Sequence, residues 1–327
     1  MIENTQTTTK LENNSNGEFL SFNDFKGTII TDERIRALSY DRELTYNICH
    51  TSSGTYEGLC VHLPEEKAGP VFNLNAGYDL YMKSGSLDVV VNDFIGKFNA
   101  NPAFDVSELV SKMYDKKWLL SHLYCRLLPK KRDSEELVTQ DWLDLIIDLY
   151  IDPEKELLNG INGSIRLTYN TLKSAHIDDM TIDELVKIAM NNTAKLSYVD
   201  SLFNSLKNLY DMKGSSDYLG ATEGYSYLNP LILFTSNNKT NGSAMFLANK
   251  QALKQCALEH DNRKVAILPS SVHETLVIAI QDDDGDEISD FLNMTREVNS
   301  ECVSPDDFLS DNIYIYDPVN DSFSVVS

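Results

Sequence analysis

The part of the sequence richest in groups that could do chemistry is Ile267–Leu276, ILPSSVHETL, where two serines, a histidine and a glutamate lie within five residues. Serine, histidine and a carboxylate are the side chains of a nucleophilic hydrolase, in which the histidine acts as base and the carboxylate orients it. The candidate catalytic residues are therefore Ser270, Ser271, His273 and Glu274.

The expected conformation of this stretch does not bring these groups into one catalytic array. On a β-strand Ser271 and His273 share a face but lie about 6.6 Å apart along the strand, and Glu274 points to the opposite face. A nucleophile elbow needs Gly-x-Ser-x-Gly between a strand and a helix, and this motif is absent here. A second interpretation is a tight turn, in which Pro269 sets the bend and the serines bond to backbone groups. A third is a binding role for His273 or Glu274.

Metal ligands show no recognisable pattern in this sequence. His273-Glu274 is not followed by a second histidine at the spacing of an HExxH helix. The six histidines have no ligand-like spacing, and the five cysteines are scattered without a close pair. The acidic run DDDGDE at 282–287 lacks the ligand order of an EF-hand loop. We expect neither a metal nor another cofactor.

The charge balance is strongly acidic, with 50 Asp and Glu against 28 Lys and Arg and a net charge of −22. Such a field repels nucleic acid phosphates and anionic membranes, so we expect neither as a partner. Between Asp282 and Asp311 eleven residues are acidic and only Arg296 is basic. This face is expected to be solvated, and it also suits a basic partner.

The first residues, MIENTQTTTKLENNSNGEF, are polar and lack the apolar region of a signal peptide. No window approaches 18 consecutive apolar residues, which a membrane-spanning helix needs. Scattered cysteines in an odd number do not suggest a disulfide framework. We therefore expect a cytoplasmic protein with a disordered segment over residues 1–16.

Apolar periodicity predicts short strands alternating with amphipathic helices in the first two thirds of the chain. The clearest helix begins at a capping box formed by Thr181 and Glu184. The expected strands are Leu44–His50, Tyr56–Leu63, Pro70–Asn75, Asp144–Ile151 and Gly163–Asn170. The other expected helices include Ser107–Leu128, in two pieces, and Leu196–Leu209.

The last third is expected to follow the order β-β-α-β-β-α-β-β, with a short extra helix capped by Ser304 before the last hairpin. Its predicted strands include Leu231–Thr235, Ser243–Leu247, Val265–Leu268 and Val272–Ile280. Paired strands separated by helices are typical of antiparallel sheets, so the fold class is α+β with two lobes. Residues 17–211 form the expected N-terminal lobe, 212–230 a connecting segment rich in Gly, Ser and Tyr, and 231–327 the C-terminal lobe.

Three patches of the sequence resemble an uncharacterised bacterial family, domain of unknown function 5688. They are GTYEGLCVHL with PVFNLNAGYDLYMKSGSLDVVVNDF, then TIDELVKIAMNNT, and finally ILPSSVHETLVI with MTREVNSECVSPDDFLSDNIYIYD. The resemblance implies no activity. It implies that the family's characteristic cluster consists of Pro269 to Glu274 with Asn299, Ser310 and Asp311.

These observations favour a binding or regulatory protein whose partner is another protein or a small molecule. One alternative is a hydrolase in which His273 is the base, Ser270 or Ser271 the nucleophile, and Glu274 or Asp311 the orienting group. Another alternative is an acidic inhibitor or nucleic-acid mimic that acts on a basic partner.

Overall fold

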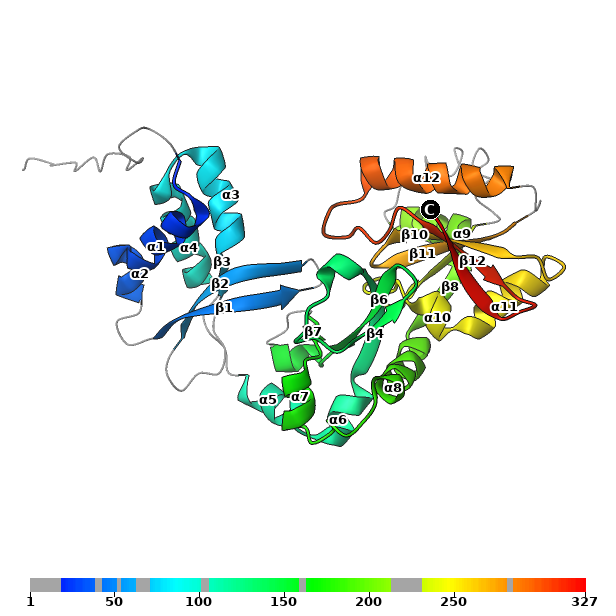
Figure 1. The fold of residues 1–327 in the computed structure, drawn as a ribbon, viewed down its shortest axis with the longest axis horizontal. Helices are drawn as coiled ribbons and strands as arrows, with labels where there is room; N and C mark the ends of the chain where they lie inside the picture. The colour runs from blue at the N-terminus through cyan, green and yellow to red at the C-terminus, as the bar shows by residue number, and fades with distance from the viewer. Residues whose placement is uncertain are drawn as a thin grey trace, which may run out of the picture. The chain divides into compact units, whose positions relative to one another are not determined.

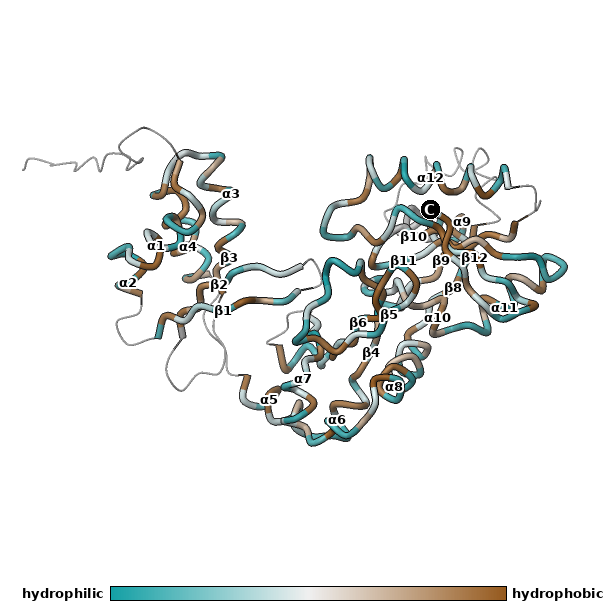
Figure 2. Tube along the Cα trace, viewed as in Figure 1, coloured by the Kyte–Doolittle hydropathy of each residue, from teal (hydrophilic) through white to brown (hydrophobic). Residues whose placement is uncertain are grey.

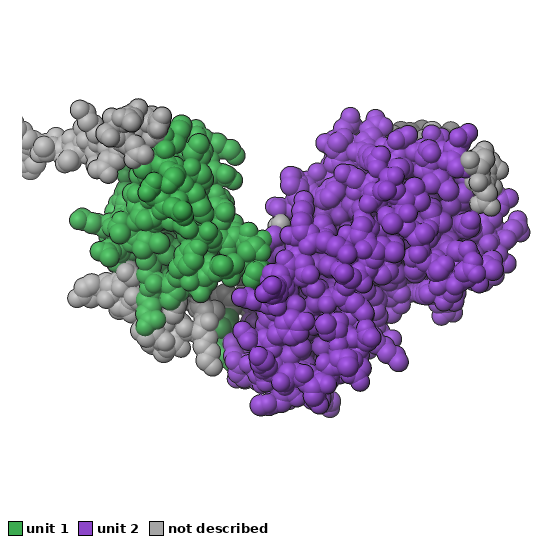
Figure 3. Space-filling view, viewed as in Figure 1, with its two compact units in different colours: residues 1–50, 55–108 green, residues 51–54, 109–327 purple. Residues whose placement is uncertain are grey.

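The computed structural model describes residues 19–38, 43–51, 54–62, 71–100, 106–158, 163–212, 231–280 and 285–327 (Figure 1). The chain divides into two compact units: unit 1 comprises residues 1–50 and 55–108, and unit 2 comprises residues 51–54 and 109–327 (Figure 3). Both units combine helices with antiparallel sheets, which confirms the predicted α+β class.

Unit 1 packs helices on one face of a three-stranded sheet with the order β1-β2-β3. Its strands are β1 (Glu43–Thr51), β2 (Gly54–His62) and β3 (Val71–Asn73). Its helices are α1 (Phe22–Thr31), α2 (Glu33–Leu38), α3 (Leu74–Ser84) and α4 (Leu87–Ala100). Leu59, Val61 and Phe72 of the sheet share one core with Phe25 of α1 and Phe94 of α4. The predicted hairpin and third strand are confirmed.

The first sheet of unit 2 has the order β4-β6-β5, and β7 also pairs with β6. Its strands are β4 (Leu123–Pro129), β5 (Thr139–Trp142), β6 (Leu145–Ile151) and β7 (Ile165–Arg166). The helical segments near it are α5 (Ser107–Met113), α6 (Lys116–Ser121), η1 (Lys130–Arg132), η2 (Lys155–Leu158), α7 (Tyr169–Ser174) and α8 (Ile182–Lys195). The capping box of Thr181 and Glu184 is present at the start of α8, as predicted.

The second sheet of unit 2 is fully antiparallel, with the order β13-β12-β10-β11-β9-β8. Its strands are β8 (Ser197–Ser201), β9 (Ile232–Ser236), β10 (Val265–Ser271), β11 (Glu274–Ala279), β12 (Ile313–Asp317) and β13 (Ser322–Val326). Its helices are α9 (Leu202–Met212), α10 (Met245–Ala248), α11 (Lys250–Leu258) and α12 (Asp286–Cys302).

Successive residues of this second sheet enter two different cores, as the period of a β-strand requires. Val265 and Ile267 of β10 join the core shared with the first sheet and α11. Ala266 and Leu268 of the same strand face α12, which covers the other side. Figure 2 shows hydrophilic and hydrophobic residues alternating along α12, as expected for a helix with one face on a sheet.

Several secondary-structure predictions are wrong, and tertiary pairing explains two of them. Leu123–Leu128, predicted as the end of a helical stretch, lies in strand β4, because all residues of this strand pair with β6. Leu196–Leu209 begins with strand β8, which pairs with β9. Ser243–Leu247, predicted as a strand, leads into helix α10. The Ser243 hydroxyl instead bonds to the backbone of Leu127 in β4. It donates to the Leu127 carbonyl at 3.0 Å and accepts the Leu127 N–H at 2.9 Å, so both backbone groups have a partner at the edge of the sheet.

The observed division of the chain differs from the expected one at residues 212–230. Residues 213–230 of that connecting segment lie outside the described residues, as does the segment 1–16. Strand β8 precedes the connecting segment and β9 follows it, and these strands are direct neighbours in one sheet. No helix in the described ranges is long and apolar enough to cross a membrane.

A buried ion-pair cluster lies inside the first sheet of unit 2. Asp148 of β6 is fully buried, and Arg126 of β4 and Arg166 of β7 are nearly so. The Arg126 Nε donates to Asp148 Oδ2 at 2.9 Å, and the Arg166 Nε donates to Asp148 Oδ1 at 2.7 Å. The Arg126 guanidinium also lies 4.7 Å from the centre of the Tyr150 ring. Both oxygens of one carboxylate therefore hold two buried cations in place.

We predict that Asp148→Asn destabilises unit 2 by about 3–5 kcal/mol, because two guanidinium groups lose their buried counter-charge. Both tryptophans of the chain, Trp118 and Trp142, lie in unit 2, so urea unfolding followed by tryptophan fluorescence reports this unit. The matched control is Asp141→Asn, whose carboxylate pairs with Lys130 at the exposed surface, and we expect no measurable change there. Equal effects of the two substitutions would contradict the role of the buried cluster.

Candidate functional site

The stretch ILPSSVHETL forms strands β10 and β11 and the two-residue turn between them, Val272–His273, here called the β10–β11 turn. The register of the two strands shifts between Leu268 and Ser271, where β10 carries one residue more than β11. Pro269 lies in this bulge, a position that suits proline because it has no N–H for the ladder. The side chain of Ser270 lies outside the described residues.

His273 is held by two hydrogen bonds of its ring. Its Nδ1 accepts the backbone N–H of Asn241 at 3.1 Å. The ring proton must then be on Nε2, which lies 3.1 Å from Asp307 Oδ1 and donates to it. The ring is half-exposed, with 37% of its side-chain surface accessible. Both ring nitrogens therefore have a partner within the protein.

The backbone of the β10–β11 turn is also held by hydrogen bonds. The carbonyl of His273 accepts the hydroxyl of Thr235 at 2.8 Å and the N–H of Gly242 at 3.0 Å. A Cβ atom at Gly242 would lie 2.3 Å from this carbonyl oxygen, so glycine permits the close approach. The turn is thus bonded to strand β9 and to the loop that follows it.

The Ser271 hydroxyl bonds to backbone and not to the histidine ring. Its Oγ accepts the N–H of His273 at 3.0 Å. Nucleophilic catalysis needs the serine hydroxyl to donate to a ring nitrogen of the histidine. The lone pair of His273 Nδ1 already accepts the Asn241 N–H, so it does not accept from serine. Glu274 is half-buried opposite Thr235 of β9, and no hydrogen bond joins it to His273 among the described side chains. The arrangement suits anchoring of the turn better than proton transfer.

The segment before the last hairpin supplies the carboxylate of Asp307. Ser304 Oγ accepts the Asp307 N–H at 3.2 Å, which is the predicted cap contact. The predicted helix is wrong, because residues 305–307 form a turn. The Asp307 carbonyl accepts the N–H of Val272 at 2.8 Å. Arg132, after β4, donates to the carbonyl of Pro305 at 2.9 Å. This segment therefore contacts both the β10–β11 turn and the first sheet.

Asn241 links the β10–β11 turn to the buried ion-pair cluster. Its side-chain Oδ1 accepts a hydrogen bond from the Arg126 Nη1 at 2.8 Å, and its backbone N–H donates to His273. Asn241 has a positive φ of 54°, a conformation that asparagine tolerates better than most residues. Hydrogen bonds thus run without a break from Asp148 through Arg126 and Asn241 to His273.

Asn299 of α12 contacts Ser310 and Asp311, which lie in the segment before β12. The Asn299 amide donates to the Ser310 carbonyl at 2.8 Å and to Asp311 Oδ1 at 3.0 Å. The Ser310 hydroxyl donates to Asp144 Oδ2 at 3.2 Å, in the turn between β5 and β6. Burial, above all, raises the pKa of the neighbouring Tyr314 hydroxyl. The group joins α12 and the last hairpin to the first sheet.

An apolar cavity of about 190 Å³ lies between α12 and the second sheet and is here called the α12 cavity. It is lined by Leu202, Leu231, Leu268, Pro269, Leu276, Met294, Thr295, Val298 and Asn299. Pro269 and Asn299 thus bring two parts of the family cluster to one cavity. The Thr295 hydroxyl is bonded to the carbonyl of Phe291 in its own helix. Thr295 and Asn299 are the polar residues of this lining.

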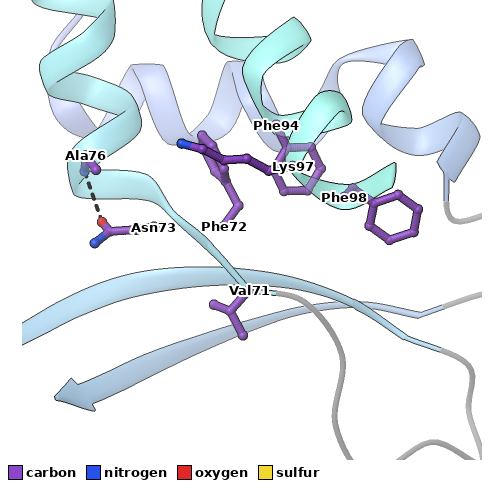
Figure 4. A pocket seen from close by; sticks show the side chains of 7 residues that line it. All are labelled: Val71, Phe72, Asn73, Ala76, Phe94, Lys97 and Phe98. Carbon is purple, nitrogen blue, oxygen red and sulfur yellow. Dashed lines mark hydrogen bonds between the residues drawn. The ribbon is translucent and has the colours of Figure 1, made fainter. Parts of the chain in front are cut away.

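Unit 1 has a larger hollow, of about 400 Å³, lined by Val71, Phe72, Asn73, Ala76, Phe94, Lys97 and Phe98 and here called the unit 1 hollow (Figure 4). The Lys97 ammonium lies 5.9 Å from the centre of the Phe72 ring and 2.7 Å from the Asp93 carboxylate. The Asn73 side chain caps α3. None of the site residues expected from the sequence lines this hollow.

Metal-binding chemistry has no candidate in the part of the chain that the structure describes, where no group of three or more His, Cys, Asp or Glu side chains converges. All five cysteines are thiols. Burial raises the pKa of the Cys125 thiol to about 12, so this group is no nucleophile at neutral pH.

The sequence interpretation missed the residues that connect the site to the core. Asn241 belongs to an Asn-Gly pair that predicts a turn, but nothing in the sequence indicates its contacts with Arg126 and His273. Arg126 and Asp148 had a signal, because each is a charged residue inside an apolar run, LYCRLL and LIIDLYI. A charge in such a run must be paired when it is buried, so oppositely charged residues in two apolar strands suggest neighbours in one sheet.

We predict that His273→Phe destabilises unit 2 by about 1–3 kcal/mol, because the Asn241 N–H and the Asp307 carboxylate both lose their partner. Urea unfolding followed by tryptophan fluorescence measures this change. Asp307→Asn is the matched control: it keeps an oxygen that accepts from the ring, so we expect a smaller loss. A His273→Phe protein as stable as the natural chain would show that the ring does not anchor the turn.

The comparisons with known proteins agree with the sequence resemblance. The sequence model of a family described as "Family of unknown function (DUF5688)" matches residues 22–318. No curated protein matches the chain, and no solved structure does. The match covers most of the chain, in both units, and it includes the β10–β11 turn, α12 and the segment up to β12. The chain is therefore a member of the DUF5688 family.

Proposed function

We propose that this protein is a binding module that docks a basic segment of a partner protein along α12, with one apolar side chain of that segment in the α12 cavity. The observation that carries the proposal is the position of an apolar cavity beside a helix whose exposed side is acidic. Apolar anchors that fill a pocket supply most of the affinity at protein interfaces, and surrounding charges select the partner.

The size of the α12 cavity favours a single side chain over a whole small molecule. Pockets for small ligands span roughly 300–1,000 Å³. The α12 cavity, at about 190 Å³, is smaller. A cavity of about 150 Å³ holds one benzene molecule, so a leucine, methionine or phenylalanine side chain is of the right size here.

The charges on α12 border the mouth of the cavity. Met294 and Val298 line the cavity and are 40% and 42% exposed. Asp290, Glu297 and Glu301 are exposed and lie three or four residues from one of these two. Residues at this spacing share one side of a helix, so carboxylates flank the apolar opening. Lysine or arginine beside an apolar anchor is the complementary pattern in a partner.

The chemistry of the lining suits an apolar anchor. The wall is apolar except for Thr295, whose hydroxyl bonds within α12, and Asn299. As part of the same proposal, the protein acts in the bacterial cytoplasm, where its cysteines stay reduced.

A hydrolase at the β10–β11 turn is the weaker proposal. His273 would first have to give up the Asn241 N–H before its Nδ1 could accept a proton from serine. An acidic inhibitor that mimics nucleic acid would bind its target through charge alone. The docking proposal differs from this alternative because it requires the apolar cavity.

The test is fluorescence anisotropy with a short labelled helical peptide of lysine and leucine, and with its counterpart carrying glutamate in place of lysine. We predict that the lysine peptide binds, that added salt weakens binding, and that Val298→Trp weakens it by about tenfold or more. This variant fills the cavity and keeps every charge of α12, so it separates docking from charge attraction.

Phe98→Ala is the control for location, because it alters the unit 1 hollow and leaves α12 unchanged. We expect no change in affinity for this variant. Binding that survives Val298→Trp at full strength would contradict the proposal and favour attraction by charge alone. Loss of binding in Phe98→Ala would place the peptide in unit 1 instead.

A further inference from the structure

Strand β1 of unit 1 is a long edge strand without the usual protection. It has nine residues, ELTYNICHT, and among the described strands it pairs only with β2. Proteins normally protect an edge strand with lysine, proline, a bulge or a short length. β1 contains neither lysine nor proline, and its single acidic residue is Glu43, at one end. Its outer edge is therefore a template for another strand.

The pairing of β1 with β2 determines which backbone groups face outward. His50 lies opposite Thr55, since His50 Nδ1 and Thr55 Oγ1 are 3.0 Å apart. A Cβ at Gly58 would lie 3.5 Å from the Asn47 carbonyl oxygen, so these two residues are also opposite. Both contacts fit one antiparallel register, in which each step forward along β1 corresponds to one step backward along β2.

Two residues lie between the end of β1 and the start of β2. In such a two-residue hairpin the flanking residues, here Thr51 and Gly54, form a hydrogen-bonded pair. Hydrogen-bonded and non-bonded positions alternate along an antiparallel strand. The residues whose N–H and C=O groups then point to the outer edge are Leu44, Tyr46, Ile48 and His50.

We propose that β1 pairs antiparallel with β1 of a second copy of this chain, about a two-fold axis at Asn47. The four outward residues are arranged symmetrically around Asn47. In this register Tyr46 lies opposite Ile48 of the second copy, and Leu44 lies opposite His50. Antiparallel pairing would give the outward backbone groups partners whatever the sequence of the second strand, so the side chains must select the occupant.

The side chains of β1 suit the same register. Tyr46 and Ile48 are 46% and 60% exposed and lie on one face of the strand. Pairs of an aromatic and a β-branched residue across two strands stabilise a sheet, and this register forms two of them. Glu43 lies opposite Thr51, so no two carboxylates face each other in a chain with a net charge of −22. A continuous six-stranded sheet results, with the helices of both copies on one face.

A disulfide at the axis tests the register directly. Asn47 opposes Asn47 of the second copy as a non-hydrogen-bonded pair, with Cα atoms about 4.5 Å apart, within the range of about 4.4–6.8 Å that a disulfide needs. We expect Asn47→Cys in a Cys49→Ser, Cys302→Ser background to form a linked dimer on mild oxidation, seen on a non-reducing gel.

Thr45→Cys in the same background is the matched control. Thr45 lies on the same strand and the same face, but the register separates the two copies of this residue by about 13 Å along the strands. We expect no linked dimer for it. Linking through Thr45 instead of Asn47 would overturn the register, and linking of neither above the background would overturn the pairing.

Charge exchange tests the interface without a covalent link. Chains with lysine at both positions, Tyr46→Lys with Ile48→Lys, should be monomers in sedimentation velocity. Chains with Tyr46→Glu and Ile48→Glu should also be monomers, whereas an equal mixture of the two should form dimers. Circular dichroism of each variant checks that it is folded. A natural chain that sediments as a monomer at high micromolar concentration, or folded variants that remain separate when mixed, would overturn the proposal.

Discussion

The Asp148 carboxylate, buried between the guanidinium groups of Arg126 and Arg166, is the interaction on which the rest of unit 2 depends. Burial of ionic groups is costly, so it is sustained only when each group has a partner in good geometry. Asp148 gives both arginines such a partner. Arg126, once held in this way, can present its remaining donors to groups outside the first sheet.

Those remaining donors connect the core to the candidate site. Arg126 bonds to Asn241, whose backbone N–H meets the ring of His273, and Nε2 of that ring donates to Asp307. His273 is therefore best understood as a link between three segments. The same turn positions the Pro269 bulge at the wall of the α12 cavity. Two residues of the cluster implied by the family resemblance, Pro269 and Asn299, thus line the cavity at which we propose that a partner docks.

The sequence was sufficient for those parts of the fold that local patterns determine. The α+β class, the β10–β11 hairpin, the capping box of Thr181 and the last hairpin all follow from periodicity and turn residues. Strands β4 and β8 did not, because their apolar residues fit a helix equally well and only the pairing partner decides. Asn241 and Gly242 were missed for a related reason: their roles depend on the position of His273, which is distant in the sequence.

The most direct test of this account is a double-mutant cycle between Arg126→Met and His273→Phe, with the free energy of unfolding measured by tryptophan fluorescence in urea. Among the described residues no hydrogen bond joins these two side chains directly, and Asn241 bonds to both of them. Residues in one hydrogen-bond network show interaction energies of about 0.5–3 kcal/mol, and independent sites add within about 0.5 kcal/mol. We predict an interaction energy of about 1 kcal/mol or more. Additive effects within about 0.5 kcal/mol would contradict the claim that the buried ion-pair cluster supports the β10–β11 turn.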